Sequence, residues 1–275
     1  MALESLTLLI EKRLNELVVT SSSPEQQLFE AARYTLLNPG KRLRPLLTLA
    51  TAEAFGAGTD TALDPACAIE MIHTYSLIHD DLPCMDDDNM RRGMPTLHRI
   101  YSEGHAVLTG DFLLTYAFEV IADAPYLTAE QKLDLISTLS KAAGGAGMVR
   151  GQVLDIAFEG KTIDLSLLEY IHHSKTSTLM TAALEFGAIC GNATLKQREI
   201  IREFGSQLGL AFQILDDLRD DGQEVKEKTT IVSILGTEEA KKRLEKLTIS
   251  SLEMLSGLGI PTSRLVDLTH WILAL

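Results

Sequence analysis

The chain has 275 residues, 45% of them hydrophobic, and can therefore bury a large core in one large domain or two small ones. Its 38 acidic and 25 basic side chains give a net charge of −13, which argues against nucleic acid as a partner. The three cysteines are scattered and odd in number, which argues against a disulfide framework or a zinc site. The N-terminal residues do not resemble a signal peptide, and no apolar run reaches the length of a membrane span. We therefore expect a cytoplasmic protein with no stable membrane insertion.

Hydrophobic residues recur at helical spacing through nearly the whole chain, and strand-like alternation is scarce. No Gly/Ser-rich or Pro-rich linker and no repeat divides the sequence. We therefore expect a single all-α domain over residues 1–275. Helices are predicted over residues 3–18, 24–37, 46–55, from just after Pro65 to about Pro83, 104–122, 170–189 and 200–215, and again within 237–275 with a break at 256–261.

A basic turn precedes the predicted helix 46–55. Lys41, Arg42 and Arg44 stand directly before its start, and Pro45 is suited to an early helical position. Free N–H groups at a helix N-terminus, together with positive side chains, bind anions, and phosphate is the usual occupant. A basic surface turn explains this stretch equally well when it is taken alone.

The next predicted helix runs into a cluster of aspartates, at positions 80, 81, 86, 87 and 88. Pro83 should kink or end the helix, so the carboxylates gather at a helix C-terminus, where the macrodipole is already negative. Because nothing local favours this arrangement, a bound cation is its natural explanation. Carboxylates suit Mg²⁺ that is shared with substrate phosphates. The alternative for an isolated cluster of this kind is an acidic, solvated loop.

Three residues of the same helix are placed by their spacing from the aspartates. His73 lies seven residues before Asp80, which is two turns away on the same face. A lone histidine on a helix is more often a packing or surface residue than a ligand, so both interpretations stay open. Tyr75 and Ser76 lie a little over one turn before the aspartates and should point deeper into any cavity that these carboxylates cap.

A second acidic helix end follows much later in the chain. Gln213, Asp216, Asp217 and Asp220 are three or four residues apart and share one helix face. Two such clusters favour a metal site more strongly than one. Between them, Gly151-Gln152 and Lys175-Thr176 are weaker signals, and a helix break explains the glycine-rich segment equally well.

Taken together, these residues resemble the trans-isoprenyl diphosphate synthases, and the bacterial farnesyl diphosphate synthases in particular. DDLPCMD at 80–86 and DDLRD at 216–220 resemble the two aspartate-rich motifs of that family. The resemblance covers residues 25–235 in the right order. It includes Gly40 to Pro45, His73, Arg91 to Gly93, Gly151-Gln152, Lys175-Thr176 and Phe212-Gln213.

The resemblance implies an all-α helical bundle around a deep central cavity, the isoprenoid synthase type, usually as a homodimer. It implies condensation of isopentenyl diphosphate with dimethylallyl or geranyl diphosphate to give farnesyl diphosphate. The steps are magnesium-assisted ionisation, condensation and proton elimination, with the released pyrophosphate as the base.

The resemblance also implies roles for individual residues. Asp80, Asp86 and Asp216 would hold a cluster of three Mg²⁺ ions, with Asp81, Asp217 and Asp220 in support. Lys41, Arg44, His73 and Arg92 would bind isopentenyl diphosphate, and Arg91, Lys175 and either Lys226 or Lys228 would bind the allylic diphosphate. Lys175, Thr176 and Gln213 would act at the reacting carbons. Tyr75, with Ser76 beside it, would limit product length.

Three other functions compete with this one. A geranylgeranyl or longer-chain synthase shares the first motif. A class I terpene cyclase also uses aspartate-rich helices, but it does not need a second diphosphate site such as Lys41, Arg44 and His73. A non-catalytic regulatory subunit commonly loses aspartates, and both motifs are intact here; only the segment from Asp220 to Lys228, shorter than the usual loop, favours it.

Overall fold

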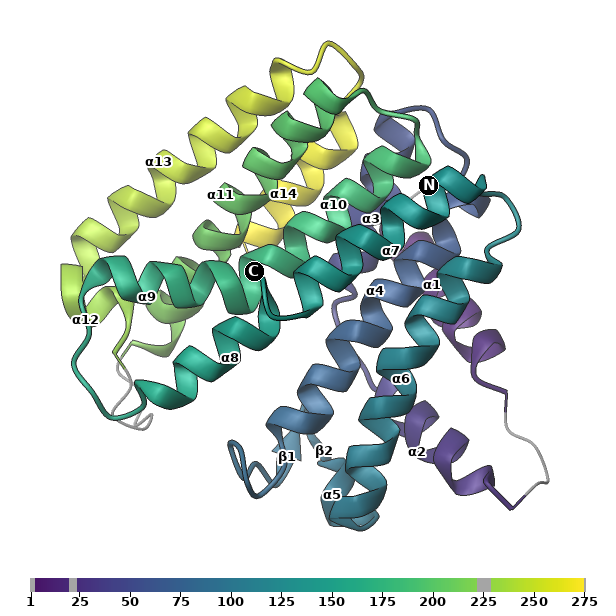
Figure 1. The fold of residues 1–275 in the computed structure, drawn as a ribbon. Helices are drawn as coiled ribbons and strands as arrows, with labels where there is room; N and C mark the ends of the chain where they lie inside the picture. The colour runs from purple at the N-terminus through teal and green to yellow at the C-terminus, as the bar shows by residue number, and fades with distance from the viewer. Residues whose placement is uncertain (1–2, 20–23, 222–228, 275) are drawn as a thin grey trace. The chain divides into compact units, whose positions relative to one another are not determined.

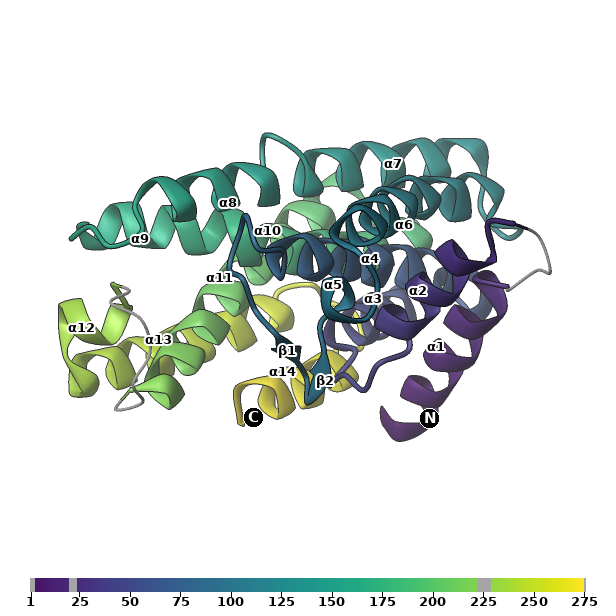
Figure 2. The same cartoon turned by 90° about the horizontal axis from the view of Figure 1, so that it is seen from below.

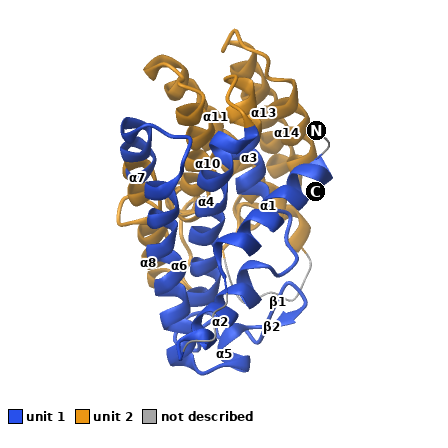
Figure 3. Ribbon diagram, turned by 90° about the vertical axis from the view of Figure 1, so that its right-hand side faces the viewer, with its two compact units in different colours: residues 1–49, 59–136 blue, residues 50–58, 137–275 orange. Residues whose placement is uncertain are grey.

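The structure, a computed structural model, describes residues 3–19, 24–221 and 229–274. Helices make up nearly all of these residues, which confirms the expected all-α fold (Figure 1). The chain forms two compact units (Figure 3). Unit 1 comprises residues 1–49 and 59–136, and unit 2 comprises residues 50–58 and 137–275. Helices α3 (Leu43–Ala54) and α7 (Ala129–Ala143) each contribute residues to both units.

Unit 1 is built around α4, which packs along α6, and the two helices lie side by side in Figures 1 and 2. Its other elements pack on this pair or connect to it. The helices of unit 1 are α1 (Leu3–Leu17), α2 (Gln26–Leu36), α4 (Thr59–Asp80), α5 (Leu97–Ile100) and α6 (Glu103–Asp123). Ile69 and Ile72 of α4 and Leu113 of α6 are fully buried in this core, in line with the helical spacing of the apolar residues.

Helix α4 begins at Thr59, earlier than the start after Pro65 that we predicted. Pro65 lies inside the helix, where it removes one backbone hydrogen bond. The turns before it are held by packing, because Ala62 and Leu63 are buried. Asp64 is also buried and accepts hydrogen bonds from Arg13 Nε at 2.7 Å and Nη2 at 3.1 Å. Tertiary contacts thus override the local signal of the proline.

A two-stranded hairpin that the sequence analysis did not anticipate follows the first aspartates. Strands β1 (Met90–Arg91) and β2 (Met94–Pro95) are antiparallel, and Met90 pairs with Pro95. The turn residues Arg92 and Gly93 have φ values of 53° and 77°, as in a type I′ turn. An arginine in this conformation is uncommon and costs about 1 kcal/mol or more. The hairpin thus holds Arg92 in one strained geometry.

Unit 2 is built around α11, which packs against α10 and α13. Figures 1 and 2 both show α11 and α13 side by side. Its elements are α8 (Met148–Ala157), α9 (Leu165–His172), the π-helical turn η1 (His173–Ser177), α10 (Thr178–Cys190), α11 (Leu195–Asp220), α12 (Ile231–Leu235), α13 (Thr237–Ser256) and α14 (Ser263–Ala274). Thr194 starts α11 with a capping box in which Gln197 is the partner.

The predicted helix 170–189 is in fact three elements, α9, η1 and α10. It begins earlier than predicted, because Asp164 caps α9 by accepting a hydrogen bond from Leu167 N at 2.8 Å. The spacing of the hydrophobic residues did not predict the π-helical turn.

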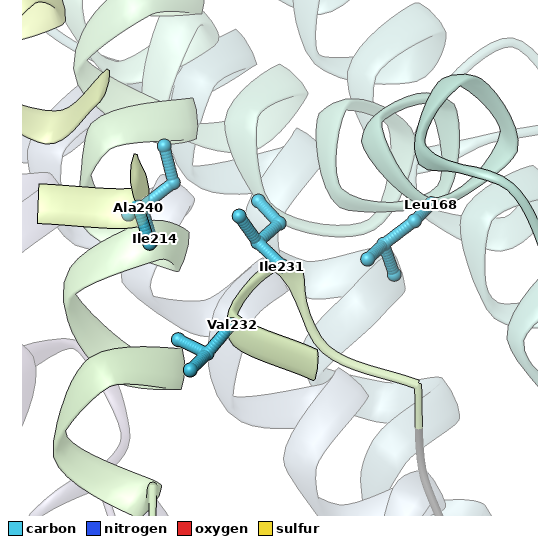
Figure 4. Packing of buried hydrophobic residues seen from close by; sticks show 5 residues of the cluster. All are labelled: Leu168, Ile214, Ile231, Val232 and Ala240. Atoms are coloured by element: carbon cyan, nitrogen blue, oxygen red, sulfur yellow. The ribbon is translucent and has the colours of Figure 1, made fainter. Parts of the chain in front are cut away.

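A small apolar cluster anchors the end of α11. Figure 4 shows Leu168 of α9, Ile214 of α11, Ile231 and Val232 of α12, and Ala240 of α13, all of them buried. Four helices meet here, so the C-terminal turns of α11 are fixed by packing on their apolar side. The acidic residues at this helix end therefore lie on a segment whose position is held by core packing.

Helix α6 is the one helix within the described residues whose length and composition would allow it to cross a membrane, with a mean hydropathy of 1.2 over its best window. Asp111 and Glu119 interrupt the apolar sequence of this helix, which is why no uninterrupted apolar run of that length was expected. Core helices of globular proteins pass the same test. The absence of stable membrane insertion and the cytoplasmic location therefore stay predictions.

Candidate active site

A buried ion pair lies beneath the basic turn of unit 1. Arg42 Nη1 donates to Glu70 Oε1 at 3.0 Å, and Nη2 donates to Asn38 O at 2.8 Å. The side chains of Arg42 and Glu70 are 0% and 2% exposed. We expected Arg42 to belong to a basic turn that binds anions, but its guanidinium is instead paired with Glu70 inside the protein. Glu70 itself was not predicted to have a role. Glu70 stands between Ile69 and Met71 in an apolar stretch, and a lone acid in such a stretch was the signal that could have revealed it.

Three of the four residues predicted to bind isopentenyl diphosphate come together above this pair. Arg92 Nη2 lies 3.4 Å from His73 Nε2. Arg44, in the first turn of α3, is close enough for charge repulsion with Arg92, and its positive charge lowers the pKa of His73. The fourth residue, Lys41, is exposed on the neighbouring turn. The structure thus forms a cation cluster, defined here as Arg44, His73 and Arg92.

Burial and mutual repulsion set the charge of this cluster. Desolvation lowers the pKa of Arg44 to about 10, so its guanidinium is still charged at neutral pH. Desolvation, followed by the nearby positive charges of Arg44 and Arg92, holds the pKa of His73 well below 6.5. His73 is therefore neutral at pH 7 and offers an imidazole N–H without adding a further charge.

The first acidic motif divides its two adjacent aspartates between different surroundings. Asp81 is buried and accepts hydrogen bonds from Arg91 Nε at 2.8 Å and Nη2 at 2.5 Å. Burial raises the pKa of Asp81, and the hydrogen bonds from Arg91 oppose that rise. Arg91 Nη2 also contacts Asp88 Oδ2 at 2.9 Å. Asp81 therefore anchors the hairpin, and the predicted role of Arg91 toward a diphosphate stays a prediction.

Asp80 and Asp86 lie close together at the C-terminal end of α4. Asp86 N donates to Asp80 O at 2.9 Å, which brings the two backbones together. Asp80 is half-buried at the end of α4, and Asp86 is exposed. Carboxylates on residues whose backbones meet in this way suit a hard cation.

Tyr75 lies on the same helix, five residues before Asp80, and is only 6% exposed. Desolvation raises its pKa to about 12, so its hydroxyl is neutral. Ser76 Oγ donates to His73 O at 2.9 Å, which keeps that hydroxyl bonded to its own helix. Of these two residues, Tyr75 is the one that contributes a large buried side chain.

Lys175 and Thr176 of unit 2 lie in the π-helical turn η1. Lys175 Nζ donates to Asp155 Oδ2 of α8 at 2.7 Å. Two glycines allow close packing on this turn, since a Cβ at Gly151 would lie 2.3 Å from Lys175 N, and one at Gly209 would lie 2.5 Å from Ser177 Cβ. Turns of this kind are frequent at functional sites. The placement of Lys175 thus depends on both neighbouring helices.

In the second acidic motif, Asp217 Oδ2 accepts a hydrogen bond from Ile231 N at 2.7 Å, at the start of α12. Asp216 and Gln213 are half-buried on α11, and Asp220 is exposed. Lys226 and Lys228 lie outside the described residues, so their predicted contact with the allylic diphosphate stays a prediction.

The donor set fits one kind of metal site. Among the described residues, no three histidine, cysteine, aspartate or glutamate side chains come close enough to hold a metal ion by themselves. Mg²⁺ is usually held by one or two carboxylates, water and substrate phosphates, not by an all-protein cage. Asp80 and Asp86 of unit 1 therefore suit Mg²⁺ that arrives with a phosphate ligand, and the predicted participation of Asp216 stays a prediction.

Replacing Glu70 with glutamine should destabilise the protein. The Arg42 guanidinium would stay buried with only the longer contact to Glu11, at 3.7 Å, as counter-charge. Loss of the main partner of a buried pair costs up to about 3–5 kcal/mol. Urea denaturation at pH 7.5 measures this as a loss in the free energy of unfolding.

The matched control is Glu238→Gln, which removes the carboxylate from the exposed pair with Lys241 at 3.1 Å. It should change the free energy of unfolding by no more than about 0.5 kcal/mol. Similar small effects of the two substitutions would show that the Arg42–Glu70 pair does not support the fold.

The low pKa of His73 should make stability depend on pH. Below about pH 6.5 the unfolded chain protonates this histidine but the folded chain does not, so acid favours unfolding. Between pH 7.5 and pH 5.5 this contributes a loss of about 1.4 kcal/mol. In His73→Gln, the free energy of unfolding measured in urea should fall less over that range by the same amount. An unchanged pH dependence in the variant would contradict a neutral, desolvated His73.

Comparison with known proteins gives a consistent result. Residues 25–232 match the family model described as polyprenyl synthetase. A farnesyl diphosphate synthase of Geobacillus stearothermophilus is 45% identical over 86% of this chain and 84% of its own length. A chloroplastic geranylgeranyl pyrophosphate synthase of Capsicum annuum is 41% identical over 90% of this chain and 70% of its own.

A solved structure agrees with both relatives. The geranyltransferase of Helicobacter pylori, crystallised with magnesium and isoprenyl diphosphate, superposes with a TM-score of 0.88 at 34% identity. The match covers 99% of this chain and 95% of that one. The resemblance inferred from the two acidic motifs is confirmed, and the chain belongs to the polyprenyl synthetase family.

Proposed function

We propose that this polyprenyl synthetase condenses isopentenyl diphosphate with dimethylallyl or geranyl diphosphate to form farnesyl diphosphate. The observation that carries the proposal lies within unit 1. Arg91 binds Asp81 of the acidic motif, and the next residue, Arg92, reaches His73 of the cation cluster. Two successive arginines therefore connect the acidic motif, which suits a metal-bound diphosphate, with the cation cluster, which suits a diphosphate without metal. A reaction of two diphosphate substrates needs both sites. A terpene cyclase would need only the first.

The cation cluster, with Lys41, would bind the isopentenyl diphosphate. Each guanidinium can donate two parallel hydrogen bonds to a phosphate group, and Arg44 Nε is buried without a hydrogen-bond partner. The neutral His73 adds a donor without increasing the repulsion between the arginines.

The acidic helix ends would bind the allylic diphosphate. We assign Asp80, Asp86 and Asp216 as ligands of a cluster of three Mg²⁺ ions. Bound Mg²⁺ would offset the negative charge that builds on the diphosphate as its bond to carbon breaks. Arg91, Lys175 and either Lys226 or Lys228 would contact the same diphosphate, with Asp155 orienting Lys175.

Carbon chemistry then proceeds without a protein base. The allylic C–O bond breaks, the double bond of isopentenyl diphosphate forms the new C–C bond, and the released pyrophosphate removes the proton. The carbonyl oxygens of the Thr176 segment and the side chain of Gln213 would stabilise the allylic cation. Such chemistry needs a single enclosed cavity, and we propose that residues 1–275 form it as one domain.

We propose a homodimer in the cytoplasm. Val149, Val153 and Ile156 share one face of α8 and are 46%, 60% and 50% exposed. A contiguous apolar helix face of this kind favours coverage by another protein surface. A geranylgeranyl product is the alternative, because the Capsicum annuum relative is named for that activity.

The test of function is incubation of the purified protein with dimethylallyl diphosphate, isopentenyl diphosphate and Mg²⁺, followed by product sizing. We expect farnesyl diphosphate, formed only with the metal. Asp80→Asn should lower kcat/KM by about a hundredfold or more. Asp123→Asn, at the exposed end of α6, is the control and should keep full activity. A protein that forms no prenyl diphosphate would contradict the proposal and favour the regulatory subunit.

Tyr75→Ala should lengthen the product. Removing a buried ring would open space below the aspartates, so the chain would grow past farnesyl to geranylgeranyl diphosphate. The readout is the ratio of the two products at equal substrate conversion. Tyr116→Ala, which removes a tyrosine of α6 bonded to Leu17 O, should leave the ratio unchanged. If Tyr75→Ala still stops at farnesyl diphosphate, another residue limits the chain.

A further inference from the structure

His79 connects Tyr75 to helix α6. Its imidazole meets the Tyr75 ring edge to face, with ring centroids 5.7 Å apart and an interplanar angle of 77°. Its Nε2 lies 3.1 Å from the carbonyl oxygen of Val107. Because a carbonyl oxygen only accepts, Nε2 carries the proton and donates. His79 is thus held by a hydrogen bond on one side and by an aromatic contact on the other.

The neighbouring helix makes room for this imidazole at one residue. A Cβ at Gly110 would lie 2.1 Å from His79 Nε2 and 2.5 Å from Cδ2, so no residue larger than glycine fits there unless the ring moves. Glycine inside a helix costs about 1 kcal/mol relative to alanine, and Gly110 lies well within α6. Val107 and Gly110 are one turn apart on α6, so together they contact the imidazole of His79 from the same side.

We infer that His79 is a positioning residue that holds the Tyr75 ring in its buried orientation and thereby sets the length of the product. The inference rests on the proposed function, in which Tyr75 limits chain growth. The hydrogen bond to Val107 and the space above Gly110 fix the imidazole, and the imidazole blocks one direction in which the phenol ring could turn away. The product limit thus depends on three residues of α6 and α4 besides Tyr75: Val107, Gly110 and His79.

Two substitutions test this from opposite sides. His79→Ala removes the imidazole. Gly110→Ala places a methyl group where the imidazole lies and so displaces it, without changing the sequence of α4. An aromatic contact of this kind holds a ring with a preference of about two- to tenfold, so each variant should raise the ratio of geranylgeranyl to farnesyl product by about that factor. His79→Gln can still donate to Val107 O and should lie between the alanine variant and the parent protein.

Combined variants separate a positioning role from general damage. If His79 acts through Tyr75, His79→Ala should not change the product ratio further in a Tyr75→Ala background. Adding Gly110→Ala to His79→Ala should cost no stability in urea, since the side chain that it would strike is gone. A lower kcat in any variant would indicate that the neighbouring Asp80 is disturbed, whereas a changed product ratio would indicate that the Tyr75 ring has moved.

The product ratios separate the role of His79 from the proposed function. If Tyr75→Ala lengthens the product but His79→Ala and Gly110→Ala leave the ratio unchanged, the role of His79 is overturned and the proposed function stands. If Tyr75→Ala does not lengthen the product, or no condensation occurs, the proposed function fails in that respect and the inference fails with it. Longer products in both single variants, with no further change in the Tyr75→Ala background, would support it.

Discussion

The ion pair between Arg42 and Glu70 is the constraint on which the basic side of unit 1 depends. A buried guanidinium is costly unless a carboxylate and further hydrogen-bond acceptors surround it. Glu70 supplies that carboxylate from the middle of α4, and the turn before α3 must approach it closely. Arg42 therefore takes a left-handed φ of 49°, and the first turn of α3 follows with Arg44 beside His73. One buried negative charge thus allows several positive groups to gather within a protein that is acidic overall.

In each acidic motif the protein itself binds the second aspartate, Asp81 through Arg91 and Asp217 through the backbone N–H of Ile231. These hydrogen bonds offset part of the negative charge that opposes the dipole at each helix end. Counting carboxylates in a sequence does not reveal these partners, which lie 10 and 14 residues further along the chain.

The sequence predicted the features that depend on periodicity and missed those that depend on single contacts. The helical fold and the acidic helix ends follow from regular apolar spacing, which packing preserves. The hairpin at Arg91 was missed because its strands have two residues each and an arginine occupies a turn position that usually takes asparagine or glycine. The start of α4 was misplaced because buried Asp64 and its neighbours outweigh Pro65. Glu70 was overlooked because its importance comes from Arg42, which lies 28 residues away.

The π-helical turn at His173–Ser177 sets the rotation of the helix that follows it. A π turn holds one more residue than an α turn over the same length, so everything after it is rotated by about 100° relative to an uninterrupted α-helix. Deleting one residue here would straighten the helix and turn Lys175 away from Asp155. Gly151 of α8 and Gly209 of α11 fit the wider turn from two sides, so both neighbouring helices accommodate the extra residue. A deletion within His173–Ser177 should therefore be far more damaging than a substitution on the exposed surface of the same helix.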